Sequence, residues 1–108
     1  MFNFLKKNDD TFKKIPVNEL DELIGKIQLI DIREASELRG GTIRTAKHVP
    51  MQTLLTNPDK YMNKEETYYF LCRSGNRSGT AAKRLAKEGY QVVSVDGGFS
   101  SYRGKNKV

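Results

Sequence analysis

One segment of the chain combines a potential nucleophile with residues that could hold an anion. It contains the only cysteine of the sequence and reads Cys72-Arg73-Ser74-Gly75-Asn76-Arg77-Ser78-Gly79. A loop that joins the carboxyl end of a strand to a helix N-terminus turns its backbone N–H groups inward and forms a nest for an anion. When a cysteine opens the nest, that anion is its own thiolate, the nucleophilic form of the side chain. The segment predicts nucleophilic chemistry at Cys72, although an isolated cysteine is more often a small buried apolar residue.

The loop residues that follow the cysteine have types that suit such a nest. Arg73 and Arg77 supply positive charge which, with the dipole of the following helix, favours the thiolate, so no separate general base is needed. Gly75 permits a positive φ and a close backbone approach. Ser78 is of a type that caps helices, and its hydroxyl could satisfy an N–H group of the first turn. The candidate site consists of the catalytic residue Cys72 and the binding loop Arg73, Ser74, Gly75, Asn76, Arg77 and Ser78.

The elements that must position this loop alternate between extended and helical patterns. The segment Thr67–Leu71, directly before Cys72, is rich in aromatic residues and gives the strongest strand signal. After the loop, small apolar residues at helical spacing predict a helix over residues 78–88, ended by Gly89. Further strands are expected at residues 12–15, 28–31, 46–49 and 92–95, and short helices at residues 18–24, 34–38, 51–55 and 58–62. Asn18 is expected to cap the first of these helices.

Strands separated by helices imply βαβ units and parallel pairing. The expected fold is α/β, with a small, mostly parallel central sheet of about five strands and helices on both faces. Ligands bind at the carboxyl ends of the strands in such sheets. Asp31, Cys72 and Asp96 each end or follow a predicted strand, so three loops could meet at one edge. We expect residues 1–11 to be a flexible arm, residues 12–104 to form the domain, and residues 105–108 to be a basic tail.

Composition and charge narrow the class of protein. A chain of 108 residues allows one domain with a single modest core. One cysteine excludes an internal disulfide and therefore a disulfide-stapled secreted scaffold. The N-terminus has no long apolar stretch of the kind found in signal peptides and membrane spans, so we expect a cytoplasmic protein. The formal net charge is +6, but the lysines are scattered, which indicates solvated faces. We therefore expect no nucleic-acid partner and no membrane association.

Four segments of the chain together resemble the rhodanese (sulfurtransferase) domain. They are Leu29-Ile30-Asp31-Ile32-Arg33-Glu34, Gly41-x-Ile43-x-x-Ala46-x-x-Val49-Pro50, Cys72-x-x-Gly75-x-Arg77-Ser78 and Gly97-Gly98-Phe99-x-x-Tyr102. The segments follow the order of the family, and the resemblance covers residues 12–104. It implies a rhodanese-like fold in which the cysteine accepts a sulfane sulfur as a persulfide and passes it to a nucleophile. We expect no cofactor and no metal.

Two of these segments depart from the pattern of the family. The common sequence Gly-His-Ile-Pro-Gly-Ala here reads Gly41-Thr42-Ile43-Arg44-Thr45-Ala46, which removes the histidine, the proline and the second glycine. Phe99 and Tyr102 stand where the family often has tryptophan. Neither departure touches the cysteine loop, so the expected fold is unchanged, and the lost histidine bears on site packing and substrate preference.

The reaction implied by this resemblance is a double displacement at sulfur. The Cys72 thiolate attacks the outer sulfur of a donor such as thiosulfate, and a nucleophilic acceptor, either cyanide or a thiol, then removes the sulfur from the persulfide. The chain has no second cysteine to resolve the persulfide, so the acceptor must come from outside, and a protein donor or acceptor is possible. A persulfide carrier with little turnover of free donors would use the same Cys72.

A cysteine-dependent phosphatase or arsenate reductase is a less favoured alternative. The phosphatases place five residues between the thiolate and the arginine of the loop, whereas four residues separate Cys72 from Arg77. The shorter loop predicts a smaller cavity, which suits one sulfur atom better than a tetrahedral phosphate or arsenate.

Polar residues outside the loop are expected to support the structure. Asp31 and Arg33 follow a predicted buried strand and could form an internal ion pair that supports the site. His48 is expected to be a strand residue without catalytic duty. Asp96 is expected to shape the glycine turn that follows it.

Overall fold

The computed structural model of the protein describes residues 11–108. Within these residues, one five-stranded sheet has the strand order β1-β5-β4-β2-β3, and every neighbouring pair is parallel. The strands are β1 (Lys13–Pro16), β2 (Gln28–Asp31), β3 (Lys47–His48), β4 (Thr67–Leu71) and β5 (Gln91–Asp96). The expected α/β class with a parallel sheet is confirmed.

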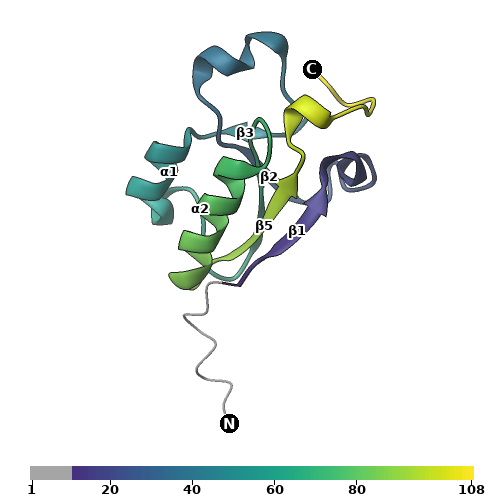
Figure 1. The fold of residues 1–108 in the computed structure, drawn as a ribbon. Coiled ribbons are helices and arrows are strands. Elements are labelled where there is room, and N and C mark those ends of the chain that lie inside the picture. The colour runs from purple at the N-terminus through teal and green to yellow at the C-terminus, as the bar shows by residue number, and fades with distance from the viewer. Residues whose placement is uncertain (1–10) are drawn as a thin grey trace.

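Helical segments connect the strands and cover the sheet. They are the α-helices α1 (Met51–Thr56) and α2 (Asn76–Lys87) and the 3₁₀ helices η2 (Val17–Glu22), η3 (Ala35–Gly40), η4 (Pro58–Lys60) and η5 (Phe99–Ser101). α1 and α2 lie on one side of the sheet, and η3, η5 and the start of α2 gather at the end to which the strand arrows point (Figure 1). That end carries the carboxyl termini of the strands, where the sequence predicts the site.

Two apolar clusters fill the space on the two faces of the sheet. Successive side chains of a strand point to opposite faces, and in β4 Phe70 joins the cluster under α1 and α2, whereas Leu71 joins the one under η2. Cys72 continues the alternation and belongs to the cluster of Phe70. The Sγ atom of Cys72 therefore lies on the face of the sheet that α2 covers.

The first helical segment differs from the expected one. Asn18 was predicted to cap a helix, but η2 follows Pro16, and no side chain caps its N-terminus. The side chain of Asn18 instead donates to the carbonyl of Ser101 at 3.1 Å and accepts from the backbone N–H of Arg103 at 2.7 Å. These contacts with a segment more than eighty residues away replace the local cap.

The end of the chain returns to the fold. The backbone N–H of Thr42 donates to the carbonyl of Val108 at 3.0 Å, and the N–H of Val108 donates back at 2.9 Å. An antiparallel bridge joins Ile43 to Lys107. Residues 105–108, expected as a basic tail, thus lie against the segment where the chain departs from the family pattern. Most of the expected flexible arm, residues 1–10, lies outside the described residues.

Candidate functional site

Cys72 lies at the carboxyl end of β4 and is fully buried. The backbone N–H of Gly75 donates to its Sγ at 3.0 Å, and the N–H of Ser78 donates at 3.3 Å. Gly75 has a φ of 103°, a left-handed conformation that glycine adopts without steric cost. This turn brings both N–H groups onto the sulfur, and the loop has the nest geometry that the sequence predicts.

Ser78 contributes in a different way from the one predicted. α2 begins at Asn76, two residues before the expected start, so Ser78 lies inside the first turn and does not cap it. Its hydroxyl lies 3.1 Å from the carbonyl oxygen of Gly75 and 3.4 Å from Cys72 Sγ. The capping prediction for Ser78 is therefore wrong, because Gly75 turns the chain into the helix earlier than the sequence suggests.

A second serine, which the sequence analysis missed, stands behind Ser78. Ser94 is fully buried in β5, and its Oγ lies 2.7 Å from Oγ of Ser78. A buried hydroxyl needs a partner to offset its desolvation, and each serine supplies one for the other. The only sign in the sequence was a serine within the apolar run Val92-Val93-Ser94-Val95.

Arg77 does not act as a free cation of the loop. Its two terminal nitrogens donate to the carboxylate of Glu37, from Nη1 to Oε1 at 2.8 Å and from Nη2 to Oε2 at 2.7 Å. The hydrogen bonds from Arg77 lower the pKa of Glu37 to about 2, and the same contact raises the pKa of Arg77. The sequence analysis missed Glu37, since nothing local relates two residues that are 40 positions apart.

The predicted ion pair between Asp31 and Arg33 is present and buried. Arg33 Nη2 lies 2.8 Å from Asp31 Oδ2, and the two side chains are 3% and 1% exposed. The guanidinium of Arg33 also donates to the carbonyls of Glu37 at 3.1 Å and Gly41 at 2.8 Å. The ion pair therefore holds the backbone at Glu37 and at Gly41, the two ends of the segment 37–41.

The turn after β5 packs directly against the cysteine loop. The N–H of Phe99 donates to the carbonyl of Cys72 at 2.8 Å, and the N–H of Ser100 donates to that of Arg73 at 3.0 Å. A Cβ at Gly98 would lie 2.4 Å from the carbonyl oxygen of Arg73, so only glycine permits this approach. The loops that follow β2, β4 and β5 therefore meet, as the sequence predicts.

The other candidate residues lie around this centre. Arg73, Ser74 and Asn76 are exposed on the rim of the loop. The imidazole Nε2 of His48 lies 2.7 Å from the carbonyl oxygen of Arg33. Asp96 is exposed at the end of β5. Among residues 11–108, no group of three or more histidine, cysteine, aspartate or glutamate side chains could hold a metal ion.

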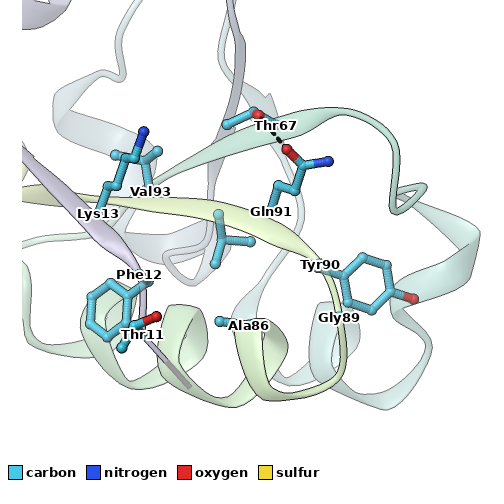
Figure 2. A pocket seen from close by; sticks show the side chains of 10 residues that line it. Thr11, Phe12, Lys13, Thr67, Ala86, Gly89, Tyr90, Gln91 and Val93 are labelled. Atoms are coloured by element: carbon cyan, nitrogen blue, oxygen red, sulfur yellow. Dashed lines mark hydrogen bonds between the residues drawn. The ribbon is translucent and has the colours of Figure 1, made fainter. Parts of the chain in front are cut away.

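A hollow of about 640 Å³ lies at the opposite end of the sheet. It is lined by Lys13, Thr67 and Gln91, the first residues of β1, β4 and β5, and by the aromatic rings of Phe12 and Tyr90 (Figure 2). Cys72 does not line it. Because ligands of open α/β sheets bind at the carboxyl ends of the strands, we assign the chemistry to the cysteine loop.

No helix within residues 11–108 is long and apolar enough to cross a membrane.

The chain is similar to known proteins over most of its length. The family model for the rhodanese-like domain matches residues 16–105. A protein of Bacillus subtilis named "Putative sulfurtransferase YtwF" is 37% identical over 91 residues, which are 82% of each chain. Another from the same organism, "Putative sulfur carrier protein YrkF", is 28% identical over 82 residues, which are 75% of this chain and 44% of that one. The crystal structure of a rhodanese-like domain protein from Staphylococcus aureus matches this structure with a TM-score of 0.79 at 31% sequence identity. The match covers 90% of this chain and 97% of the Staphylococcus aureus chain.

Proposed function

The chain belongs to the rhodanese-like domain family, and we propose that it is a sulfurtransferase that carries sulfane sulfur on Cys72. The observation that carries this proposal is the pair of N–H groups, from Gly75 and Ser78, directed at Cys72 Sγ at 3.0 and 3.3 Å. N–H groups at a helix N-terminus stabilise negative charge, and an anionic sulfur is both the attacking form of a thiol and the product of its loading. The loop is thus suited to the states of Cys72 before and after sulfur transfer.

In the loading step, the Cys72 thiolate attacks the outer sulfur of the donor. A sulfur–sulfur bond forms to Cys72 while the sulfur–sulfur bond of the donor breaks, and with thiosulfate the electron pair leaves on sulfite. In the second step, cyanide or a thiolate attacks the terminal sulfur, and the electron pair of the breaking bond returns to Cys72. Such a double displacement needs no cofactor.

The serine pair can form hydrogen bonds with both protonation states of Cys72. In the thiol form, Cys72 can donate to Ser78 Oγ across 3.4 Å. In the thiolate form, the Ser78 hydroxyl can rotate and donate to the sulfur, while Ser94, 2.7 Å away, donates to Ser78 in turn. Hydroxyl groups are donors and acceptors at once, so the same contacts serve both forms.

The mass of the intact protein under non-reducing conditions tests the proposal. After incubation with thiosulfate, the wild type should gain one sulfur atom, and added cyanide should remove it with release of thiocyanate. Cys72→Ser, which is close in shape, should lose both signals. Sulfur transfer that survives in Cys72→Ser would refute the proposal, and so would Cys72-dependent hydrolysis of p-nitrophenyl phosphate by a protein that never acquires sulfur.

A persulfide carrier is the second candidate, favoured by the similarity to a protein named as a sulfur carrier. Stable loading of Cys72 with negligible steady-state transfer from thiosulfate to cyanide would support the carrier, whereas repeated turnover would support the enzyme. In either role the donor or acceptor could be another protein. The lone free cysteine also suits the reducing cytoplasm, which we propose as its location.

A further inference from the structure

Glu37 takes no part in the steps above, yet it occupies the mouth of the cysteine loop. We use "mouth" for four charged side chains around the loop: Glu34, Glu37, Arg73 and Arg77. Arg77 and Glu37 are 35% and 19% exposed, so both can be reached from solvent. Their two parallel hydrogen bonds, at 2.8 and 2.7 Å, form the bidentate contact that binds arginine to carboxylate most strongly.

Glu37 is held in place independently of Arg77. Its Oε1 accepts a hydrogen bond from the backbone N–H of Glu34 at 2.8 Å, as part of the capping box of η3. Its carbonyl accepts one from Arg33, which is locked in turn by the buried Asp31. The carboxylate is therefore a fixed partner that the fold brings to Arg77.

This placement offsets the positive charge of Arg77 at the mouth of a basic protein. The formal net charge of the chain is +6, and Lys107 Nζ also lies near the loop, 5.5 Å from the centre of the Phe99 ring, but the carboxylate of Glu37 offsets the charge of Arg77. The charge of Arg33 is already matched by Asp31 at 2.8 Å. An incoming anion finds Arg77 with its charge compensated and both terminal nitrogens engaged, so the N–H groups of the loop remain to receive its sulfur.

We propose that Glu37 is a specificity-determining residue that favours singly charged sulfur donors, such as thiosulfonates, over the thiosulfate dianion. The inference rests on the proposed loading of Cys72. Methanethiosulfonate and thiosulfate have similar shapes and the same kind of outer sulfur. In both cases the Cys72 thiolate bonds to that sulfur and the sulfur–sulfur bond of the donor breaks, so that methanesulfinate with one negative charge or sulfite with two departs. The second charge is the one that the Glu37 carboxylate repels.

The test compares the second-order rates at which the two donors load Cys72, followed by quenching and intact mass. Glu37→Gln keeps the shape of the side chain and removes its charge. We expect it to raise the rate with thiosulfate about tenfold relative to the rate with methanethiosulfonate, an effect between those of a unit-charge contact in bulk water and of one near a protein surface. The gain should shrink as salt is added, because the contact is partly exposed.

The matched control is Glu88→Gln. Glu88 forms an exposed ion pair with Arg84 at 3.4 Å near the far end of α2, so this variant changes the net charge equally and should leave the donor preference unaltered. Arg77→Gln, which removes the opposite charge of the same pair, provides a second variant. It should shift the preference the other way, so that thiosulfate loading falls about tenfold more than methanethiosulfonate loading.

Equal changes with both donors in Glu37→Gln or in Arg77→Gln would overturn this inference, because they would mean that the pair only supports the structure. A shift in Glu88→Gln as large as that in Glu37→Gln would overturn it as well, since net charge alone would then explain the effect. Failure of both donors to load the wild type would instead refute the proposed sulfur transfer. The two failures are therefore distinguishable.

Discussion

The stability of the framework around the site depends on the charge of the buried residue Asp31. Its carboxylate accepts hydrogen bonds from Arg33 Nε at 3.0 Å, from Arg33 Nη2 at 2.8 Å and from Thr42 Oγ1 at 2.7 Å. Asp31→Asn keeps the size of the side chain and removes the charge. The guanidinium of Arg33, only 3% exposed, would then be buried without a counterion.

Breaking a buried ion pair by removal of one partner costs about 3–5 kcal/mol. A domain of this size has a free energy of unfolding of about 5–15 kcal/mol, so Asp31→Asn should remove a fifth or more of it. At about 4–8 °C per kcal/mol for small domains, a loss of about 3 kcal/mol lowers the melting temperature by roughly 12 °C or more. The cost arises from the stranded charge, since Asn can still accept a hydrogen bond.

Urea denaturation of three variants checks this reasoning. Asp31→Asn should lose about 3 kcal/mol or more, whereas Glu88→Gln, which breaks the exposed pair with Arg84, should lose about 0–1 kcal/mol. Asp31→Asn/Arg33→Met removes the stranded charge and should recover part of the loss. A cost below about 1 kcal/mol for Asp31→Asn, or a double variant no more stable than the single one, would refute the reasoning.

Two further predictions concern the contacts around the loop. Gly98→Ala places a Cβ 2.4 Å from the carbonyl oxygen of Arg73, so it should destabilise the protein by about 2 kcal/mol or more and slow the loading of Cys72. Gly40→Ala, with nothing within 4 Å of its new Cβ, should change stability by about 0.5 kcal/mol or less, and equal losses in the two variants would contradict the steric argument. The pair of Glu37 with Arg77 should weaken in acid, since the pKa of Glu37 is lowered from 4.5 to about 2 on folding. Its contribution is complete above the unfolded value and disappears as pH falls toward 2. The difference in free energy of unfolding between wild type and Glu37→Gln should therefore shrink from pH 5 to pH 2, and a constant difference would argue against the pair.

Local patterns in the sequence were sufficient for the nucleophile and its loop. The aromatic run of β4, the cysteine after it and the helical stripe of α2 are contiguous, so their order along the chain already fixes a strand, a turn and a helix. The start of α2 was misplaced because Gly75 adopts a left-handed conformation, and a glycine in the sequence shows only that such a turn is allowed. The helix expected after Asn18 was replaced by η2, because Asn18 bonds to the far end of the chain.

Contacts between distant segments could not be predicted from the sequence. They include the contact of Glu37 with Arg77, which offsets a positive charge at the site. The two arginines of the loop suggest a cationic centre when the sequence is read alone, since nothing near Arg77 in the chain indicates a counterion. The fold supplies Glu37 from a different βα connection and fixes it through Arg33 and the capping box of η3. The groups directed at the sulfur of Cys72 are thereby chiefly uncharged N–H groups, those of Gly75 and Ser78. If the proposed sulfur transfer and the proposed role of Glu37 hold, such a site holds a thiolate and a persulfide alike, while the Glu37 carboxylate determines which donors are favoured.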